Sequence, residues 1–209
     1  MTKRLESKFR ICKKLNRNYN NILVLPKGES LRSVKNEKRK KKKSSLYGKL
    51  LGVKQTFKFF YCNLQEKSFK RILKQSVESP LTTLDRFVSF LESRLDVVLF
   101  RSCFVSSMFE SRQLISHGNV RVNGKVVRNP GSNLIQLDII EIDVNLFQNE
   151  SRIQNISNDL RKNFSSRSLP SYLEVDYKTL TIVFLWDLNY KSTYYPINAN
   201  YSIIQRFYK

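Results

Sequence analysis

The chain has 209 residues, and its 38 Lys and Arg against 17 Asp and Glu give a formal net charge of +21 at pH 7. This length allows one sizeable domain or two small ones, each with a hydrophobic core. The positive charge indicates a polyanionic partner, and nucleic acid is the leading candidate because its dense phosphate charge releases counterions on binding. An anionic membrane surface is the competing partner, but no apolar run approaches the roughly 18–20 residues that a membrane span needs.

The positive charge is concentrated in the N-terminal part of the chain. Residues 1–79 hold 23 basic and 5 acidic side chains, a net of +18, whereas residues 80–209 hold 15 and 12, a net of +3. Residues 1–45 show little periodicity and are expected to form an arm that orders on RNA. A solvated tail or a localisation signal is the alternative interpretation. The arm contains one run of like charges that repel each other until they are neutralised: Lys38, Arg39, Lys40, Lys41, Lys42 and Lys43.

Cysteine spacing and codon bias bear on the compartment. Cys12, Cys62 and Cys103 lie far apart without a CxxC pair, which predicts free thiols in a reducing compartment and no metal or cofactor. Residues 1–20 lack the apolar core of a secretory signal. The favoured residues Asn, Lys, Ile, Phe and Tyr have AT-rich codons, which indicates an AT-biased genome such as an organelle's.

Helical periodicity begins after the arm. Apolar residues recur at spacings of three and four from Leu46 to Leu73, and basic residues including Lys49 and Lys54 occupy the other faces as candidate RNA contacts. A further helix is predicted over residues 83–100, with Thr82 or Thr83 as its N-cap.

A helix followed by a tight hairpin is predicted next. Ser107 and Glu110 form a capping box, and Gly118 is the expected C-cap after His117. The dipeptide Asn123-Gly124 favours a type I′ turn between two short strands.

The rest of the chain mixes strands and helices, so the predicted fold class is α+β. A strand pair is expected over 134–142 and a helix over 149–165. Two strands are expected over 172–176 and 179–185, and a short final helix after Pro196.

Basic and amide side chains cluster where the helix turns into the hairpin. The planar guanidinium group of arginine pairs well with phosphate oxygens, and amide or hydroxyl groups can reach sugar hydroxyls. This combination of side chains suits a structured RNA. Any soluble helix and hairpin also carries polar groups, so the residues alone leave an ordinary polar surface open. The candidate RNA-binding residues here are Arg94, Arg101, Arg112, Gln113, Ser116, His117, Arg121, Asn123, Lys125 and Arg128.

Enzyme signals are weak. An Arg-Leu-Asp triplet, here Arg94 to Asp96, also occurs around the catalytic aspartate of pseudouridine synthases. Leu95 continues an apolar stripe and no nucleoside pocket is recognisable, so we interpret Asp96 as a helix-surface or ion-pair residue. His117, the single histidine, has no nucleophile motif around it, and no phosphate-binding loop or dinucleotide fingerprint exists.

The segment RLDVVLFRSCF, followed by ESRQLISHG and VRVNGKVV, resembles the alpha-L RNA-binding domain of the bacterial-type small-subunit ribosomal protein four family. Outside it, LYGKLLGVKQTFKFFYC, PSYLEVD and the terminal YPINANYSIIQRFYK are similar to further elements of that family. The resemblance implies a basic arm at 1–45, a helical domain at 46–92 completed by 186–209, and an alpha-L domain at 93–185 with its core at 94–142. The alpha-L domain has two helices and a small β-sheet, and a C-terminal helix returns to the helical domain.

The resemblance also implies a function. Such proteins bind a junction of small-subunit rRNA early in assembly and lie near the mRNA entry path beside small-subunit proteins three and five. By position, their RNA face corresponds to Arg101, Arg112, Gln113, His117, Arg121, Asn123 and Lys125. A mitochondrial ribosome is the expected location, with a plastid or the bacterial cytoplasm as alternatives. No membrane partner and no homo-oligomer are expected.

The sequence departs from the family pattern in its cysteines and in one apolar segment, and two other functions are open. Many relatives carry an N-terminal cysteine cluster that holds zinc; only Cys12 lies there, so we expect no zinc. Residues 180–188 are more apolar than in the family and are expected to be core, a new protein contact being the alternative. The other functions are a pseudouridine synthase-like enzyme that uses the same RNA-binding domain, and a heat-shock-type factor that rescues stalled large subunits.

Overall fold

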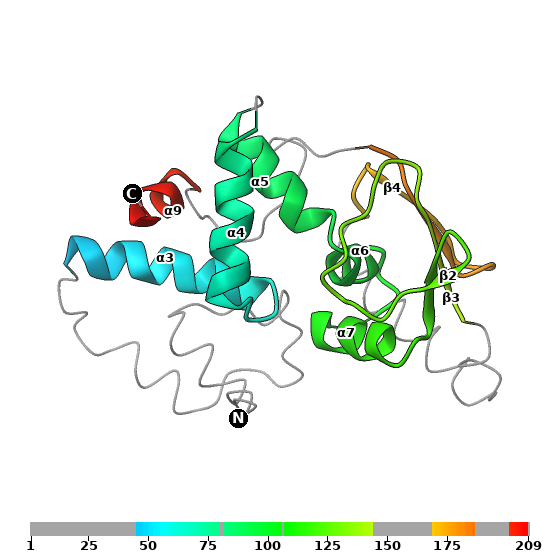
Figure 1. The fold of residues 1–209 in the computed structure, drawn as a ribbon. Coiled ribbons are helices and arrows are strands. Elements are labelled where there is room, and N and C mark those ends of the chain that lie inside the picture. Colours follow the sequence, from blue (N-terminus) through cyan, green and yellow to red (C-terminus); the bar gives the residue numbers. More distant parts are fainter. Residues whose placement is uncertain (1–44, 80–81, 106, 144–168, 187–200, 209) are drawn as a thin grey trace, which may run out of the picture. The chain divides into compact units, whose positions relative to one another are not determined.

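The computed structural model describes residues 45–79, 82–105, 107–143, 169–186 and 201–208. The chain divides into two compact units, which are described separately: residues 1–66 with 196–209, called the helical unit, and residues 67–195, called the sheet unit. The mixture of helices with one antiparallel sheet confirms the α+β fold class (Figure 1).

Two helices distant in sequence pack together in the helical unit. The rings of Tyr47 on α3 (Leu46–Phe60) and Phe207 on α9 (Tyr201–Tyr208) lie 5.8 Å apart, and Ile204 of α9 is buried. The expectation that a C-terminal helix returns to the helical part is therefore confirmed.

The helical pattern expected over 46–73 forms two helices, α3 and α4 (Glu66–Val77). Cys62 and Asn63 both adopt left-handed backbone conformations, with φ of 58° and 53°. A helix cannot continue through two such residues, and the amide of Leu64 instead donates to the carbonyl of Lys58. Apolar periodicity persists across this turn, so the pattern alone does not give the position of the break.

The helix expected over 83–100 is also interrupted, giving α5 (Thr83–Glu92) and α6 (Leu95–Arg101). Thr82 is the N-cap of α5, as expected. At the break, the Ser93 carbonyl accepts from the Leu134 amide at 2.8 Å, and the Leu95 amide donates to Ser132 at 2.9 Å. A loop far along the chain thus takes up the backbone groups that a continuous helix would have used.

In the described residues of the sheet unit, five antiparallel strands form one sheet in the order β2-β1-β3-β5-β4. Their bounds are Val120–Val122 (β1), Lys125–Val126 (β2), Ile139–Ile142 (β3), Leu173–Asp176 (β4) and Thr181–Phe184 (β5). The predicted hairpin and the two late strands are confirmed. The strand pair expected over 134–142 was wrong, because only 139–142 is a strand. The preceding residues form a turn in which the Ile135 amide donates to the Asp138 carboxylate.

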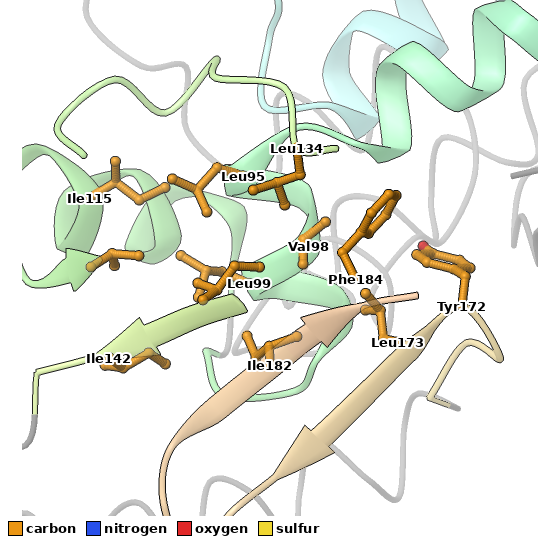
Figure 2. Packing of buried hydrophobic residues seen from close by; sticks show 12 residues of the cluster. Leu95, Val98, Leu99, Ile115, Leu134, Ile142, Tyr172, Leu173, Ile182 and Phe184 are labelled. Carbon is orange, nitrogen blue, oxygen red and sulfur yellow. The ribbon is translucent and has the colours of Figure 1, made fainter. Parts of the chain in front are cut away.

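One face of this sheet packs against α6 and α7 (Met108–Ser116), as Figure 1 shows. Leu95, Val98 and Leu99 of α6 and Ile115 of α7 meet strand residues in one buried cluster (Figure 2). Ile182 and Phe184 belong to this cluster, so the expected core position of 180–188 is confirmed for these two residues. Trp186 is about half exposed, and residues 187–188 lie outside the described part. The helix expected over 149–165 also lies outside it.

Candidate nucleic-acid interface

Helix α7 is capped at both ends as its sequence predicts. The Ser107 side chain accepts from the Glu110 amide at 3.3 Å, which satisfies one of the free amides of the first turn. At the other end Gly118 has φ of +81°, a conformation that reverses the chain into β1. The caps determine where the helix stops, and so they place Ser116 and His117 beside the start of the hairpin.

The hairpin turn is held by a side chain as well as by its backbone. Asn123 and Gly124 have φ of 51° and 75°, as a type I′ turn requires. The Asn123 amide group donates to Asp138 at 2.8 Å, and its oxygen accepts from the Ile139 amide at 3.0 Å. Asn123 therefore fastens the turn to β3, and both ends of its amide are used inside the protein.

A group of polar side chains on α7 and the hairpin faces solvent. Within the part of the chain that the structure describes, none of them has a side-chain hydrogen bond or ion pair. With Asn123 committed to the turn, this exposed set is the surface best suited to phosphate and sugar contacts: Gln113, Ser116, His117, Arg121, Lys125 and Arg128.

Arg128 lies across the end of α7 because Gly118 has no side chain. A Cβ atom built on Gly118 would lie 3.3 Å from Arg128 Nε and 3.5 Å from Val126 Cγ1. The 3.3 Å separation from Arg128 is tighter than ordinary van der Waals contact. Gly118 thus serves two purposes, the left-handed turn and the close approach of a guanidinium group to the helix end.

Two of the predicted arginines share one buried carboxylate. Arg94 donates to Asp96 through Nε at 3.0 Å and Nη2 at 2.8 Å, and Arg112 Nε donates to Asp96 Oδ2 at 2.9 Å. Only 1% of the Asp96 side chain is exposed, against 26% for Arg112. Asp96 is therefore an ion-pair residue, and its carboxylate is not available to attack a substrate.

Arg101 is held in a second buried network. Its Nε and Nη2 donate to the two carboxylate oxygens of Glu92 at 3.0 and 2.8 Å, and Glu92 also accepts from the Tyr172 hydroxyl at 3.0 Å. Burial, followed by the neighbouring Glu92 charge, raises the pKa of Tyr172 well above its usual value. The network links α5, α6 and the residue that precedes β4. Our sequence interpretation missed Glu92 and Tyr172, although a carboxylate within the apolar stripe of 84–99 was a signal for a buried cation.

The helical unit has an ion cluster of its own. Lys54 and Lys58 donate to Glu66 at 3.1 and 2.8 Å, and Tyr208 of α9 also hydrogen bonds to Glu66. Burial acts to raise the pKa of Glu66, but the hydrogen bonds from Lys58, Tyr208 and Lys54 outweigh it and lower the value to about 2. Lys54 also lies 4.1 Å from the centre of the Phe207 ring. Lys49, by contrast, is exposed and forms no ion pair within the described segments.

The structure therefore separates the candidate residues into two sets. Lys54, Arg94, Arg101, Arg112 and Asn123 are used to hold the fold, while Lys49 and the six exposed residues of α7 and the hairpin face solvent. The run from Lys38 to Lys43 lies outside the described residues.

The described part of the chain bears on the metal and membrane expectations. Cys62 and Cys103 are buried free thiols. No group of three or more His, Cys, Asp or Glu side chains there could hold a metal ion, and no helix there is both long and apolar enough to cross a membrane. Cys12 lies outside the described residues, so the absence of zinc stays a prediction.

The chain is similar to ribosomal proteins over its whole length. The S4 domain model matches residues 93–134, which include α6, α7 and the hairpin. Small ribosomal subunit protein uS4 of Ruegeria sp. (strain TM1040) is 32% identical over 212 residues, covering 100% of this chain and 98% of the relative. The chain belongs to the uS4 family. The uS4 protein of Gluconobacter oxydans (strain 621H) is likewise 32% identical, over 100% of this chain and 99% of its own length. The uS4 protein of Rhodopseudomonas palustris (strain TIE-1) is 32% identical over 88% of this chain and 87% of its own length. The resemblance inferred from the motifs is thus confirmed at the level of the family.

Proposed function

We propose that this chain is a structural constituent of the small ribosomal subunit that binds small-subunit rRNA and supports assembly and translation. The observation that carries the proposal is the exposed polar surface of α7 and the hairpin, within the S4 domain of a uS4 family member. Its cationic members have no ion pairs in the described structure, so phosphate can approach them without displacing an internal carboxylate.

Binding would combine general attraction with selective contact. Residues 1–79, with their net charge of +18, attract rRNA without regard to its sequence. The rigid surface of α7 and the hairpin then contacts the backbone of a folded junction, which is read mainly by shape. We assign direct contacts to Lys49, the run from Lys38 to Lys43, and the exposed set of α7 and the hairpin. The surface is held in shape by the residues that are paired inside the fold: Arg94, Arg101, Arg112, Asn123 and Lys54.

The finer assignments form part of the same proposal. The chain catalyses nothing, since Asp96 is buried between two arginines. It works as an arm at 1–45, a helical domain at 46–92 with 186–209, and an RNA-binding domain at 93–185. Its neighbours are small-subunit proteins three and five near the mRNA entry path. A mitochondrial ribosome is the proposed location, supported by the AT-rich codon usage that the composition implies.

The test is binding of the full-length chain to the cognate small-subunit rRNA junction at increasing salt. A protein that neutralises roughly six to ten phosphates loses about 10³–10⁵ in affinity between 50 and 200 mM salt. We expect a loss of this order, together with cosedimentation of the chain with small subunits in high-salt gradients. Affinity that does not change with salt would rule out the electrostatic mechanism, and absence from small subunits would rule out the ribosomal role.

A further inference from the structure

The sheet has a second face, opposite to the buried cluster. Side chains alternate along a strand, and Ile140 and Ile182 point into the core, so their sequence neighbours point outward. Ile139 on β3 is paired directly with Val183 on β5, and Val183 is paired with Glu174 on β4. A second outward row follows from the same register: Arg121, Glu141, Thr181 and Asp176. We call these seven residues the outward face.

The outward face has an apolar centre. Ile139 is 44% exposed, and Val183 beside it is partly exposed. In the turn that leads into β3, Ile135 and Leu137 are 74% and 71% exposed. The Leu137 amide donates to the Phe184 carbonyl at 2.7 Å, so Leu137 is held against β5 and not on a free loop. Large apolar side chains gathered at one place on a surface are typical of a binding site.

Carboxylates on β3 and β4 lie beside this apolar centre. Glu174 and Asp176 are exposed and Glu141 is partly exposed, whereas Arg121 at the β1 side is the single basic residue of the outward face. This acidic character is opposite to that of the whole chain, whose net charge is +21. RNA is therefore a poor occupant, because its phosphates would meet three carboxylates. An apolar centre flanked by charged residues is instead the pattern of a protein interface, and the excess of carboxylates selects a basic partner.

We propose that the outward face docks a basic segment of another protein, with apolar side chains of that segment on Ile139 and Val183. Its Lys or Arg side chains pair with Glu141 and Glu174, while Asp176, whose carboxylate accepts from the Lys178 amide and the Thr179 hydroxyl, adds negative charge. RNA binds on the surface of α7 and the hairpin, which meets the outward face at Arg121, so one domain joins RNA and protein on adjoining surfaces. This inference rests on the proposed ribosomal role, because the partner is sought within the small subunit.

The experiment is site-specific photo-cross-linking in purified small subunits that contain the full-length chain. The photoreactive residue p-benzoylphenylalanine replaces Val183 in one variant and the exposed Glu174 in a second, in case Val183 does not tolerate it. Gln113 on α7 is the matched control, since the same reagent there faces the proposed RNA surface. We expect the outward-face variants to cross-link to a protein peptide rich in Lys and Arg, and the Gln113 variant to cross-link to rRNA.

A charge reversal tests the chemistry of the contact. The double variant Glu141→Lys and Glu174→Lys should lower the yield of the Val183 cross-link about tenfold, because like charges then face each other. Cross-linking at Gln113 should not change. Cross-links from Val183 and Glu174 to rRNA, to other residues of this chain, or to nothing while Gln113 still reacts would each overturn the inference. Failure of every variant, and of the unmodified chain, to enter small subunits would instead overturn the proposed function.

Discussion

Arg112 Nε donates a 2.9 Å hydrogen bond to Oδ2 of Asp96, which is almost completely buried and also accepts from Arg94. Arg112 belongs to α7 and Asp96 to α6, so this pair links the two helices under the proposed RNA surface. Removing the cation should therefore affect stability as well as binding. Replacing Arg112 with Ala should lower the free energy of unfolding by about 1–3 kcal/mol, as expected for the loss of a hydrogen bond to a charged group.

Urea unfolding of the Arg112→Ala variant checks this prediction. Arg112→Lys is the matched control: it keeps the charge but cannot reproduce the planar Nε contact, so we expect it to recover part of the loss only. Wild-type stability for Arg112→Ala would show that the pair with Asp96 contributes nothing to the fold.

Arg121 is expected to behave in the opposite way. It is exposed and has no ion pair with any described residue, so Arg121→Ala should leave the unfolding midpoint within the error of measurement. If it contacts a phosphate, the slope of log affinity against log salt should become shallower by about 1. Filter binding to the rRNA junction at several salt concentrations measures this slope. An unchanged slope and affinity would remove Arg121 from the proposed surface.

Gly118 and Gly124 form a matched pair for testing the position of Arg128. Both have positive φ, so replacement with Ala should strain either turn by about 1–2 kcal/mol. Only at position 118 would the new Cβ also meet Arg128, because nothing lies within 4 Å of one at position 124. Gly118→Ala should therefore weaken rRNA binding more than Gly124→Ala does.

A double-mutant cycle with Arg128→Ala identifies the cause of that difference. When Arg128 is absent, the extra loss of affinity from Gly118→Ala should disappear, since there is no guanidinium group left to displace. If the extra loss remains, Gly118 acts through the turn alone.

Glu66 provides a prediction about pH. Its pKa is about 2 in the folded chain, below the ordinary value of 4.5, so the folded state favours the charged form. The stability from this group is present above pH 4.5 and is lost as the pH falls toward 2. Other carboxylates lose stability in the same range, so the informative quantity is the difference between the wild type and Glu66→Gln. Urea midpoints followed by far-UV circular dichroism should differ at pH 6 and converge near pH 2. A difference that stays constant with pH would contradict the prediction.

Local elements were predictable because their determinants lie close together in the sequence. Ser107 and Glu110 are three residues apart, and Asn123-Gly124 needs only its own backbone preference, so the α7 cap and the hairpin turn were predicted correctly. The break at Ser93 was not predictable in this way. It depends on hydrogen bonds to Ser132 and Leu134, and apolar periodicity cannot indicate contacts between residues so far apart in the sequence.

By itself the sequence determined the polyanionic partner, the α+β class and the family, because charge, periodicity and a local motif do not depend on distant contacts. Only the tertiary structure decided which basic residues remain available. Asp96 and Glu92 neutralise Arg94, Arg112 and Arg101 inside the fold, while Arg121, Lys125 and Arg128 stay exposed. All six carry the same charge in the sequence. They differ because a buried carboxylate binds a nearby guanidinium group to avoid the cost of an unpaired buried charge, and the folded chain alone determines which guanidinium group is near.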